Sequence, residues 1–228
     1  MKKVIFVLSF SLLIGIGLFS QTEEGPIKIW GWSKDGKVGI SEFNGTHGRI
    51  RAMIINTVDD KILWEKPCPG YYYYEDETEK KAFEKAYSEL INEFQNVCKQ
   101  QYGIELQEMD AIAPSELSNT HSGTNLITSI TISEIQYNGK TYNITVIQQS
   151  KGEESGGYTI IAEVDGKKKT IFSTGEIKGF WHYSTTFFRY CISPHGDRAL
   201  IVIKNWTLFA EESWSYRYIG CHLSSGFR

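Results

Sequence analysis

Side chains that could support metal or acid–base chemistry are few and widely spaced in this sequence. Its five histidines are His47, His121, His182, His195 and His222. No HxH or HxxxH spacing preorganises them as metal ligands, so we expect solvated or hydrogen-bonded imidazoles. The chain also lacks an HExxH motif, a P-loop and an EF-hand loop, so the sequence indicates no metal ion and no other cofactor.

A nucleophilic centre is not indicated either. Ser33 is followed by Lys34 and Asp35, which does not match the G-x-S-x-G elbow of serine hydrolases. Cys191 stands four residues before His195, but a thiol–imidazole pair rarely forms across one turn, so we interpret Cys191 as a buried strand residue. These observations favour a non-enzymatic protein. A secreted hydrolase with an unrecognised site is an alternative.

Aromatic side chains offer a different kind of site. The chain holds 13 Tyr, 12 Phe and 6 Trp, and four tyrosines are consecutive at 71–74. Alternate residues of a strand face the same side, so Tyr72 and Tyr74 could form an exposed face, joined by Trp181 or Trp214. Such a face could stack on sugar rings or on a protein partner. Alternatively, the tyrosines only close a sheet edge.

The four cysteines are Cys68, Cys98, Cys191 and Cys221. An even number in an exported chain allows disulfides, with three possible connectivities. Cys68–Cys98 and Cys191–Cys221 would each form a local pair. Four reduced, buried thiols are the alternative, and Cys98 lies on the apolar face of an expected helix. No CxxC motif indicates a zinc or redox site.

The N-terminus has the layout of a secretory signal peptide. Lys2 and Lys3 precede an apolar run at 4–19, and a polar stretch begins at Ser20. The run is short for a bilayer-spanning helix of roughly 20 residues, and no cysteine near its end indicates a lipoprotein anchor. We therefore expect a signal peptide over 1–20, an uncleaved anchor being the alternative, and a periplasmic or extracellular bacterial protein without a later transmembrane segment.

The remaining residues, 21–228, fit one folded domain. Hydrophobic residues make up 41% of the chain and charged residues 22%, as in ordinary globular proteins. The formal net charge is −3, and the longest basic run, 167–169, follows an Asp-Gly turn. No basic stripe is present, so we expect no nucleic-acid partner.

Hydrophobic periodicity predicts two β-rich halves separated by a helix. Apolar residues recur at three- and four-residue steps over 76–102, with an acidic start and Gly103 after the end. Residues 110–125 and 151–157 are polar and are expected to be loops. Strands are expected at 27–32, 38–43, 49–57, 61–65, 127–136, 141–148, 158–164, 168–173, 186–192, 199–206 and 214–222.

Two segments share a turn motif. Trp32–Val38 is W-S-K-D-G-K-V, and Ile192–Leu200 is I-S-P-H-G-D-R-A-L, with His195 in place of the aspartate. Both resemble the W-S-x-D-G-K pattern of TolB-type and related WD40-like β-propeller blades. Four complete blades would need nearly the whole mature chain, and the helix at about 76–102 leaves no room for them.

We therefore expect a mainly β (α+β) fold of antiparallel, blade-like meander sheets with one long amphipathic helix, and not a complete propeller. The resemblance implies an exported, non-enzymatic binding module of the bacterial cell envelope. Its partner would be an envelope protein or a cell-wall component. The alternatives are a carbohydrate or cell-wall binding module that uses the aromatic face, and the hydrolase named above.

Overall fold

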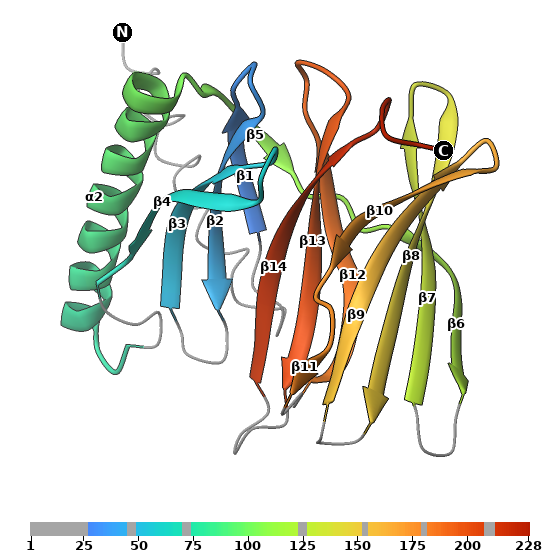
Figure 1. Cartoon of the computed structure of the whole chain (residues 1–228). Helices are drawn as coiled ribbons and strands as arrows, with labels where there is room; N and C mark the ends of the chain where they lie inside the picture. Colours follow the sequence, from blue (N-terminus) through green and yellow to red (C-terminus); the bar gives the residue numbers. More distant parts are fainter. Residues whose placement is uncertain are drawn as a thin grey trace, which may run out of the picture.

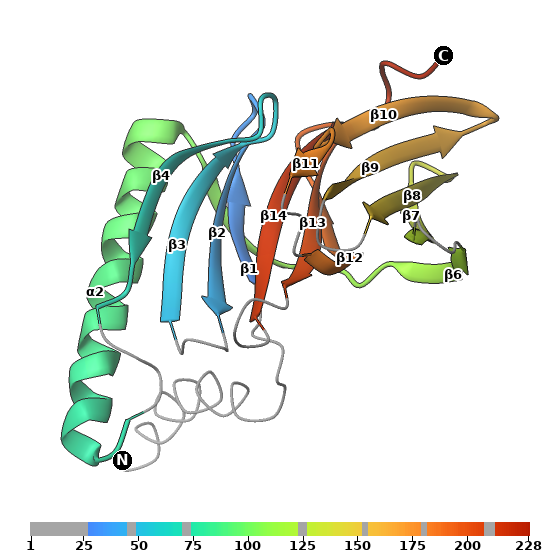
Figure 2. The ribbon, with the colours of Figure 1, turned by 60° about the horizontal axis from the view of Figure 1, so that its bottom comes forward.

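The computed structural model describes residues 27–44, 49–69, 74–122, 127–151, 155–178, 182–207 and 213–228. These residues form three antiparallel sheets and one long helix, arranged as successive layers (Figures 1 and 2). The fold is mainly β, with one helix between β4 and β5 in chain order, and it is not a complete propeller. This confirms the fold class predicted from the sequence. In the described part of the chain, no helix has the length and apolarity needed to cross a membrane; the expected signal peptide lies outside it.

Sheet A is formed by the first half of the chain in the order β4-β3-β2-β1-β5. The helix α2 (Glu77–Tyr102) runs from β4 at one edge to β5 at the other. It therefore serves as the crossover that returns the chain across the sheet, which explains why a helix interrupts the meander. The strands are β1 (Ile27–Trp32), β2 (Lys37–Asn44), β3 (Arg49–Asn56), β4 (Lys61–Pro67) and β5 (Glu105–Asp110).

Capping residues fix both ends of α2. The Asp76 carboxylate accepts hydrogen bonds from the backbone N–H groups of Thr78 (2.7 Å) and Glu79 (2.9 Å), and the Glu79 side chain accepts one from Glu75 N–H. These bonds satisfy amides that lack intrahelical partners. Gly103 ends the helix at φ 62°, a conformation that glycine adopts easily. The helix boundaries agree with the sequence prediction.

The apolar stripe of α2 packs on the outer face of sheet A. Phe94 is fully buried. Its ring stacks on Trp64 at 5.6 Å between centroids and meets Trp30 edge-on at 6.2 Å. Burial of this stripe is the main reason that the helix is stable in place.

Sheet B is the middle layer, in the order β12-β13-β14, and both of its faces are covered. It consists of β12 (His182–Ile192), β13 (Arg198–Thr207) and β14 (Ser213–His222). Along β13, Leu200 and Val202 point to the core shared with sheet A, whereas Ala199, Ile201 and Ile203 point to the core shared with sheet C. A strand buried on both faces needs apolar residues at consecutive positions.

Sheets A and B also share a buried polar contact. The Glu42 carboxylate is 3% exposed and accepts hydrogen bonds from Arg51 Nε and from the Tyr218 hydroxyl. Burial and the neighbouring Glu42 carboxylate raise the pKa of Tyr218 well above its ordinary value. Nearby, Gly220 lies so close to the Thr57 carbonyl oxygen that a Cβ would stand 1.8 Å from it. Close backbone approach therefore joins the two sheets at this point.

Sheet C covers the other face of sheet B, in the order β10-β9-β8-β7-β6. Its strands are β6 (Ser115–Ser122), β7 (Ile127–Tyr137), β8 (Lys140–Lys151), β9 (Ser155–Val164), β10 (Lys167–Ser173) and β11 (Ile177–Lys178), which also pairs with β9. The prediction of a loop over 110–125 was wrong, because β6 pairs with β7. An edge strand needs only one partner, so a polar sequence can form it through backbone hydrogen bonds.

Candidate functional site

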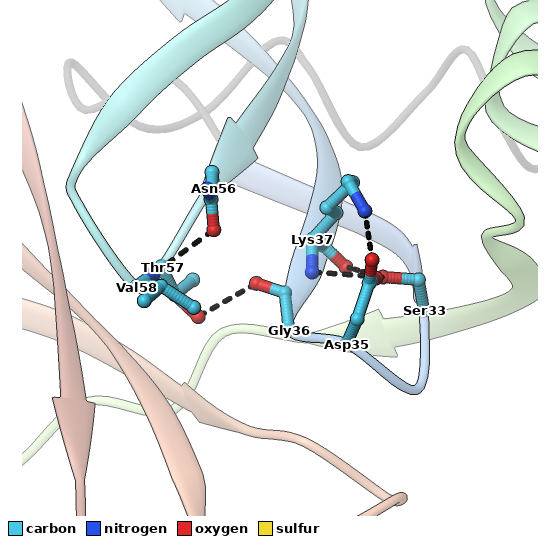
Figure 3. Close-up of polar contacts among 7 residues, drawn as sticks. All are labelled: Ser33, Asp35, Gly36, Lys37, Asn56, Thr57 and Val58. Atoms are coloured by element: carbon cyan, nitrogen blue, oxygen red, sulfur yellow. Dashed lines mark hydrogen bonds and ion pairs between the residues drawn. The ribbon is translucent and has the colours of Figure 1, made fainter.

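The first motif copy forms a closed turn (Figure 3). The Ser33 hydroxyl donates to the Asp35 carboxylate (2.6 Å) and accepts from Lys37 N–H (2.8 Å). The Gly36 carbonyl accepts from the backbone and hydroxyl of Thr57 at 3.1 and 2.7 Å. Hydrogen bonds from the Lys37 ammonium and the Ser33 hydroxyl hold the pKa of Asp35 below its usual value. The polar groups of this motif thus shape the β1–β2 turn and fasten it to the β3–β4 turn at Thr57.

The second copy repeats the construction and packs on the first. Ser193 N–H donates to the Arg198 carbonyl (2.8 Å), and His195 N–H donates to the Ser193 hydroxyl (3.2 Å). His195 Nε2 lies 3.3 Å from the Trp32 carbonyl oxygen and 3.6 Å from Glu105 Oε2. The imidazole therefore links sheets A and B.

His222 belongs to a cluster with Asp197 and Ser224 that differs from a catalytic triad by one additional hydrogen bond. Its Nε2 lies 3.3 Å from Asp197 Oδ1, and its Nδ1 lies 3.4 Å from the Ser224 hydroxyl. The Ser224 hydroxyl, however, also donates directly to Asp197. In a triad the hydroxyl donates its proton to the imidazole. Here the Ser224 proton goes to the carboxylate, and the three side chains together fasten the C-terminal residues to the β12–β13 turn.

Cys191 is buried in the core, and the side chains of the three other histidines lie outside the described part of the chain. His47 lies outside the described residues, and His121 and His182 are positioned on β6 and β12. Within the described ranges, no group of three or more His, Cys, Asp or Glu side chains could hold a metal ion. Cys191 is 2% exposed, and burial raises its thiol pKa to about 11. It is a buried strand residue.

All four cysteines are free, buried thiols, so neither expected disulfide is formed. The geometry explains this for Cys191 and Cys221. They lie on β12 and β14, which β13 separates, and they belong to opposite cores of sheet B. A disulfide requires Cα atoms no more than about 7 Å apart and converging Cβ vectors. Cys68 and Cys98 share the core between α2 and sheet A, also as free thiols.

Of the four residues of the predicted aromatic site, Tyr74 is the one whose side chain is described. Tyr74 is half-buried, with its ring 6.3 Å from that of Phe83 on α2. Trp214 stands on β14 in sheet B, two layers from the helix, and its side chain is outside the described part. Tyr72 and Trp181 also lie outside the described residues.

A pocket of about 410 Å³ opens instead on sheet C. Its floor comes from β8 and β9, and its wall comes from the segment 173–176 between β10 and β11. The lining residues are Ile147, Gln149, Ser155, Gly156, Gly157, Tyr158, Thr159, Ser173, Gly175 and Glu176.

The wall of this pocket is an arch of the chain over β9. The chain pairs with β9 along β10 as far as Ser173, separates from it over residues 174–176, and pairs with it again at β11. Gly157 lies directly under the arch: a Cβ at this position would stand 2.1 Å from the Gly175 carbonyl oxygen. Gly175 itself has φ 65°. Glycine is therefore needed at both positions, once for close approach and once for backbone conformation.

Hydrogen bonds hold the arch in place. Thr174 N–H donates to the Tyr158 carbonyl (3.0 Å), and Tyr158 N–H donates to the Thr174 hydroxyl (3.0 Å). The hydroxyls of Thr159 and Ser173 lie 3.1 Å apart. The pocket is thus preformed in the folded chain.

The lining consists mainly of neutral hydrogen-bonding groups. Thr159 and Ser173 supply hydroxyls, Gln149 supplies an amide, and Ile147 supplies apolar surface. Glu176 is the one charged side chain among the described lining residues. Hydroxyls and amides both donate and accept, so the site suits a neutral ligand rich in hydroxyl groups.

This site was not predicted from the sequence, because the polar segment 151–157 was expected to be a loop. Residues 155–157 begin β9. Two adjacent glycines at the start of a strand were the available signal, since strand glycines mark close backbone approach. The sequence did not show which other segment of the chain lies against these two glycines.

Comparison of the chain with family models, with curated proteins and with solved structures gave no match.

Proposed function

We propose that this chain is an exported, non-enzymatic binding module of the bacterial cell envelope whose pocket in sheet C binds a saccharide unit, such as one of the cell wall. The observation that carries the proposal is the pocket lining of hydroxyl, amide and backbone groups on a preformed arch. The envelope location rests on the signal-like sequence at 1–20.

The lining chemistry supports a sugar over an anion. Phosphates and carboxylates are usually bound by Arg, Lys or clustered N–H groups, and the described lining residues include no basic side chain. A hydroxyl-rich ring can exchange hydrogen bonds with Thr159, Ser173 and Gln149. Its C–H groups can contact Ile147. The volume of about 410 Å³ lies in the range of small-molecule sites.

Binding without cleavage fits the described groups better than hydrolysis does. Most glycosidases use two carboxylic residues on either side of the scissile bond. Glu176 is the one carboxylate among the described lining residues. The proposal places the saccharide in the pocket and not on the predicted aromatic face, since the pocket lining is described and the Tyr74 ring lies against Phe83 of α2.

Isothermal titration of the purified protein with monosaccharides and cell-wall fragments tests the proposal. Thr159→Val keeps the shape of the side chain and removes a hydroxyl from the pocket. Loss of one hydrogen bond, about 1 kcal/mol, should weaken binding about fivefold. Thr186→Val is the matched control, since Thr186 is also a half-buried strand residue but lies on β12 in sheet B and does not line the pocket. Absence of binding to every saccharide, or equal effects of the two variants, would contradict the proposal.

A further inference from the structure

We infer, on the basis of the proposed function, that the ligand is an oligosaccharide whose chain continues from the pocket across the outer face of sheet C. One sugar unit occupies the pocket, and the following units lie across the strands. The inference rests on the register of the sheet and on the chemistry of the side chains that share this face with the pocket.

Strand alternation separates the two faces of sheet C. Tyr142, Ile144 and Val146 of β8 point into the core shared with sheet B. The intervening residues of β8 therefore face away from that core. Thr145 and Ile147 are two of these, and both are half-buried.

Two rows of uncharged side chains cross this outer face. In one row, Ile147 pairs with Ile130 and Thr159, and Thr159 pairs with Ser173. In the next, Thr145 pairs with Ile132 and Ile161, and Ile161 pairs with Thr170. We call these two rows the neutral face; its members are Ile130, Ile132, Thr145, Ile147, Thr159, Ile161, Thr170 and Ser173.

The neutral face is continuous with the pocket. Ile147, Thr159 and Ser173 line the pocket and also form one row of the face. A chain that leaves the pocket therefore moves directly onto Ile and Thr side chains. Isoleucine offers contact to the C–H faces of sugar rings, and threonine offers hydroxyls that both donate and accept.

A charged row bounds the neutral face on the side away from the pocket. There, Asn143 pairs with Glu134 and Glu163, and Glu163 forms a 3.1 Å ion pair with Lys168. Strands are spaced about 4.8 Å apart, so four strands give a path of about 15 Å across the sheet. This path is long and narrow, as an extended short glycan is.

The test is a titration series with oligosaccharides of increasing length, from one unit to six, against the whole protein. We expect the affinity to rise at least tenfold with length and then to level off once the chain has crossed the four strands. A tenfold gain requires burial of only about 55 Å² of apolar surface at about 25 cal/mol per Å². The neutral face also predicts little dependence on salt.

Thr145→Lys places a long cation in the middle of the neutral face and outside the pocket. The variant should bind the monosaccharide as the wild type does and should lose the gain from chain length. Ile161→Thr, a milder change, should reduce that gain in part and covers the case in which the lysine variant does not fold. Val58→Lys is the control, because Val58 is 59% exposed in the β3–β4 turn of sheet A.

The outcomes are distinguishable. Monosaccharide binding with no dependence on chain length would overturn the extended path and leave the proposed function standing. No binding at any length would overturn both. Equal losses of monosaccharide and oligosaccharide affinity in Thr145→Lys would also overturn the inference. So would sedimentation showing a dimer that this variant dissociates, since a second copy would then cover the neutral face.

Discussion

Replacement of Gly157 by alanine tests the arch that forms the pocket. The new Cβ would stand 2.1 Å from the Gly175 carbonyl oxygen, whereas real Cβ atoms essentially never come closer than 3.0 Å. The arch must therefore move by about 1 Å or the strand must bend. The neighbouring hydrogen bonds between Thr174 and Tyr158, both 3.0 Å, lie at the point that has to move.

The expected magnitude follows from these contacts. Loss of the two hydrogen bonds costs about 2 kcal/mol, at about 1 kcal/mol each. Overpacking adds about 1–3 kcal/mol. The lower chain entropy of alanine in the unfolded state returns about 0.5–1 kcal/mol. We expect a net loss of about 2–4 kcal/mol in the free energy of unfolding.

Urea unfolding followed by tryptophan fluorescence measures this loss. With a slope of about 2 kcal/mol per molar urea, the midpoint should fall by about 1–2 M. In the absence of urea, the affinity of the variant for saccharides should fall at least tenfold, because the wall of the pocket is displaced. Thr174→Val should give a smaller loss of about 1 kcal/mol, since it removes the hydroxyl that accepts from Tyr158 N–H.

Gly196→Ala is the control for Gly157→Ala. A Cβ at Gly196 meets no heavy atom within 4 Å, and its backbone does not require positive φ. Its free energy of unfolding should stay within about 0.5 kcal/mol of that of the wild type. Equal midpoints and equal affinities for the two variants would refute the close approach over Gly157.

Four further outcomes are expected elsewhere in the chain. Gly220→Ala should destabilise the protein by about 1–3 kcal/mol in urea unfolding, because the Cβ would collide with a carbonyl oxygen of sheet A. Tyr218→Phe should cost about 2 kcal/mol, because the buried Glu42 carboxylate loses a donor; an unchanged midpoint would contradict this contact. Burial raises the pKa of Asp60, so the folded state holds its proton more tightly, and acidification from pH 7 through the carboxyl range should stabilise the wild type relative to Asp60→Asn. Burial raises the pKa of Cys98 to about 12, so iodoacetamide at pH 8 should leave the native thiols unmodified and should label all four cysteines after unfolding. An intact mass of the unlabelled protein that is about 2 Da per pair below the mass of the reduced chain would instead reveal disulfides.

Local sequence signals predicted much of the fold. Asp76, Glu79 and Gly103 determine the ends of α2 through their own hydrogen bonds and backbone angles. Asn138-Gly139 and Asp165-Gly166 form the expected hairpin turns, and each residue has positive φ. These features depend on neighbouring residues alone, so they can be recognised without the tertiary structure.

The two polar edge strands could not be predicted from local sequence signals. β5 and β6 carry polar sequences, and they are strands because β1 and β7 offer free edges to them. Pairing between backbones depends little on side-chain pattern at a sheet edge. The sequence therefore could not distinguish these segments from loops.

The candidate site depended still more on tertiary structure. The sequence by itself determined the helix, the hairpin turns and the apolar run of β13, because each is a local pattern of capping, turn residues or hydrophobicity. Only the tertiary structure decided that Gly157 lies under Gly175 and that Cys191 and Cys221 face opposite cores. These placements follow from strand register and layer packing, in which residues far apart in the chain come into contact.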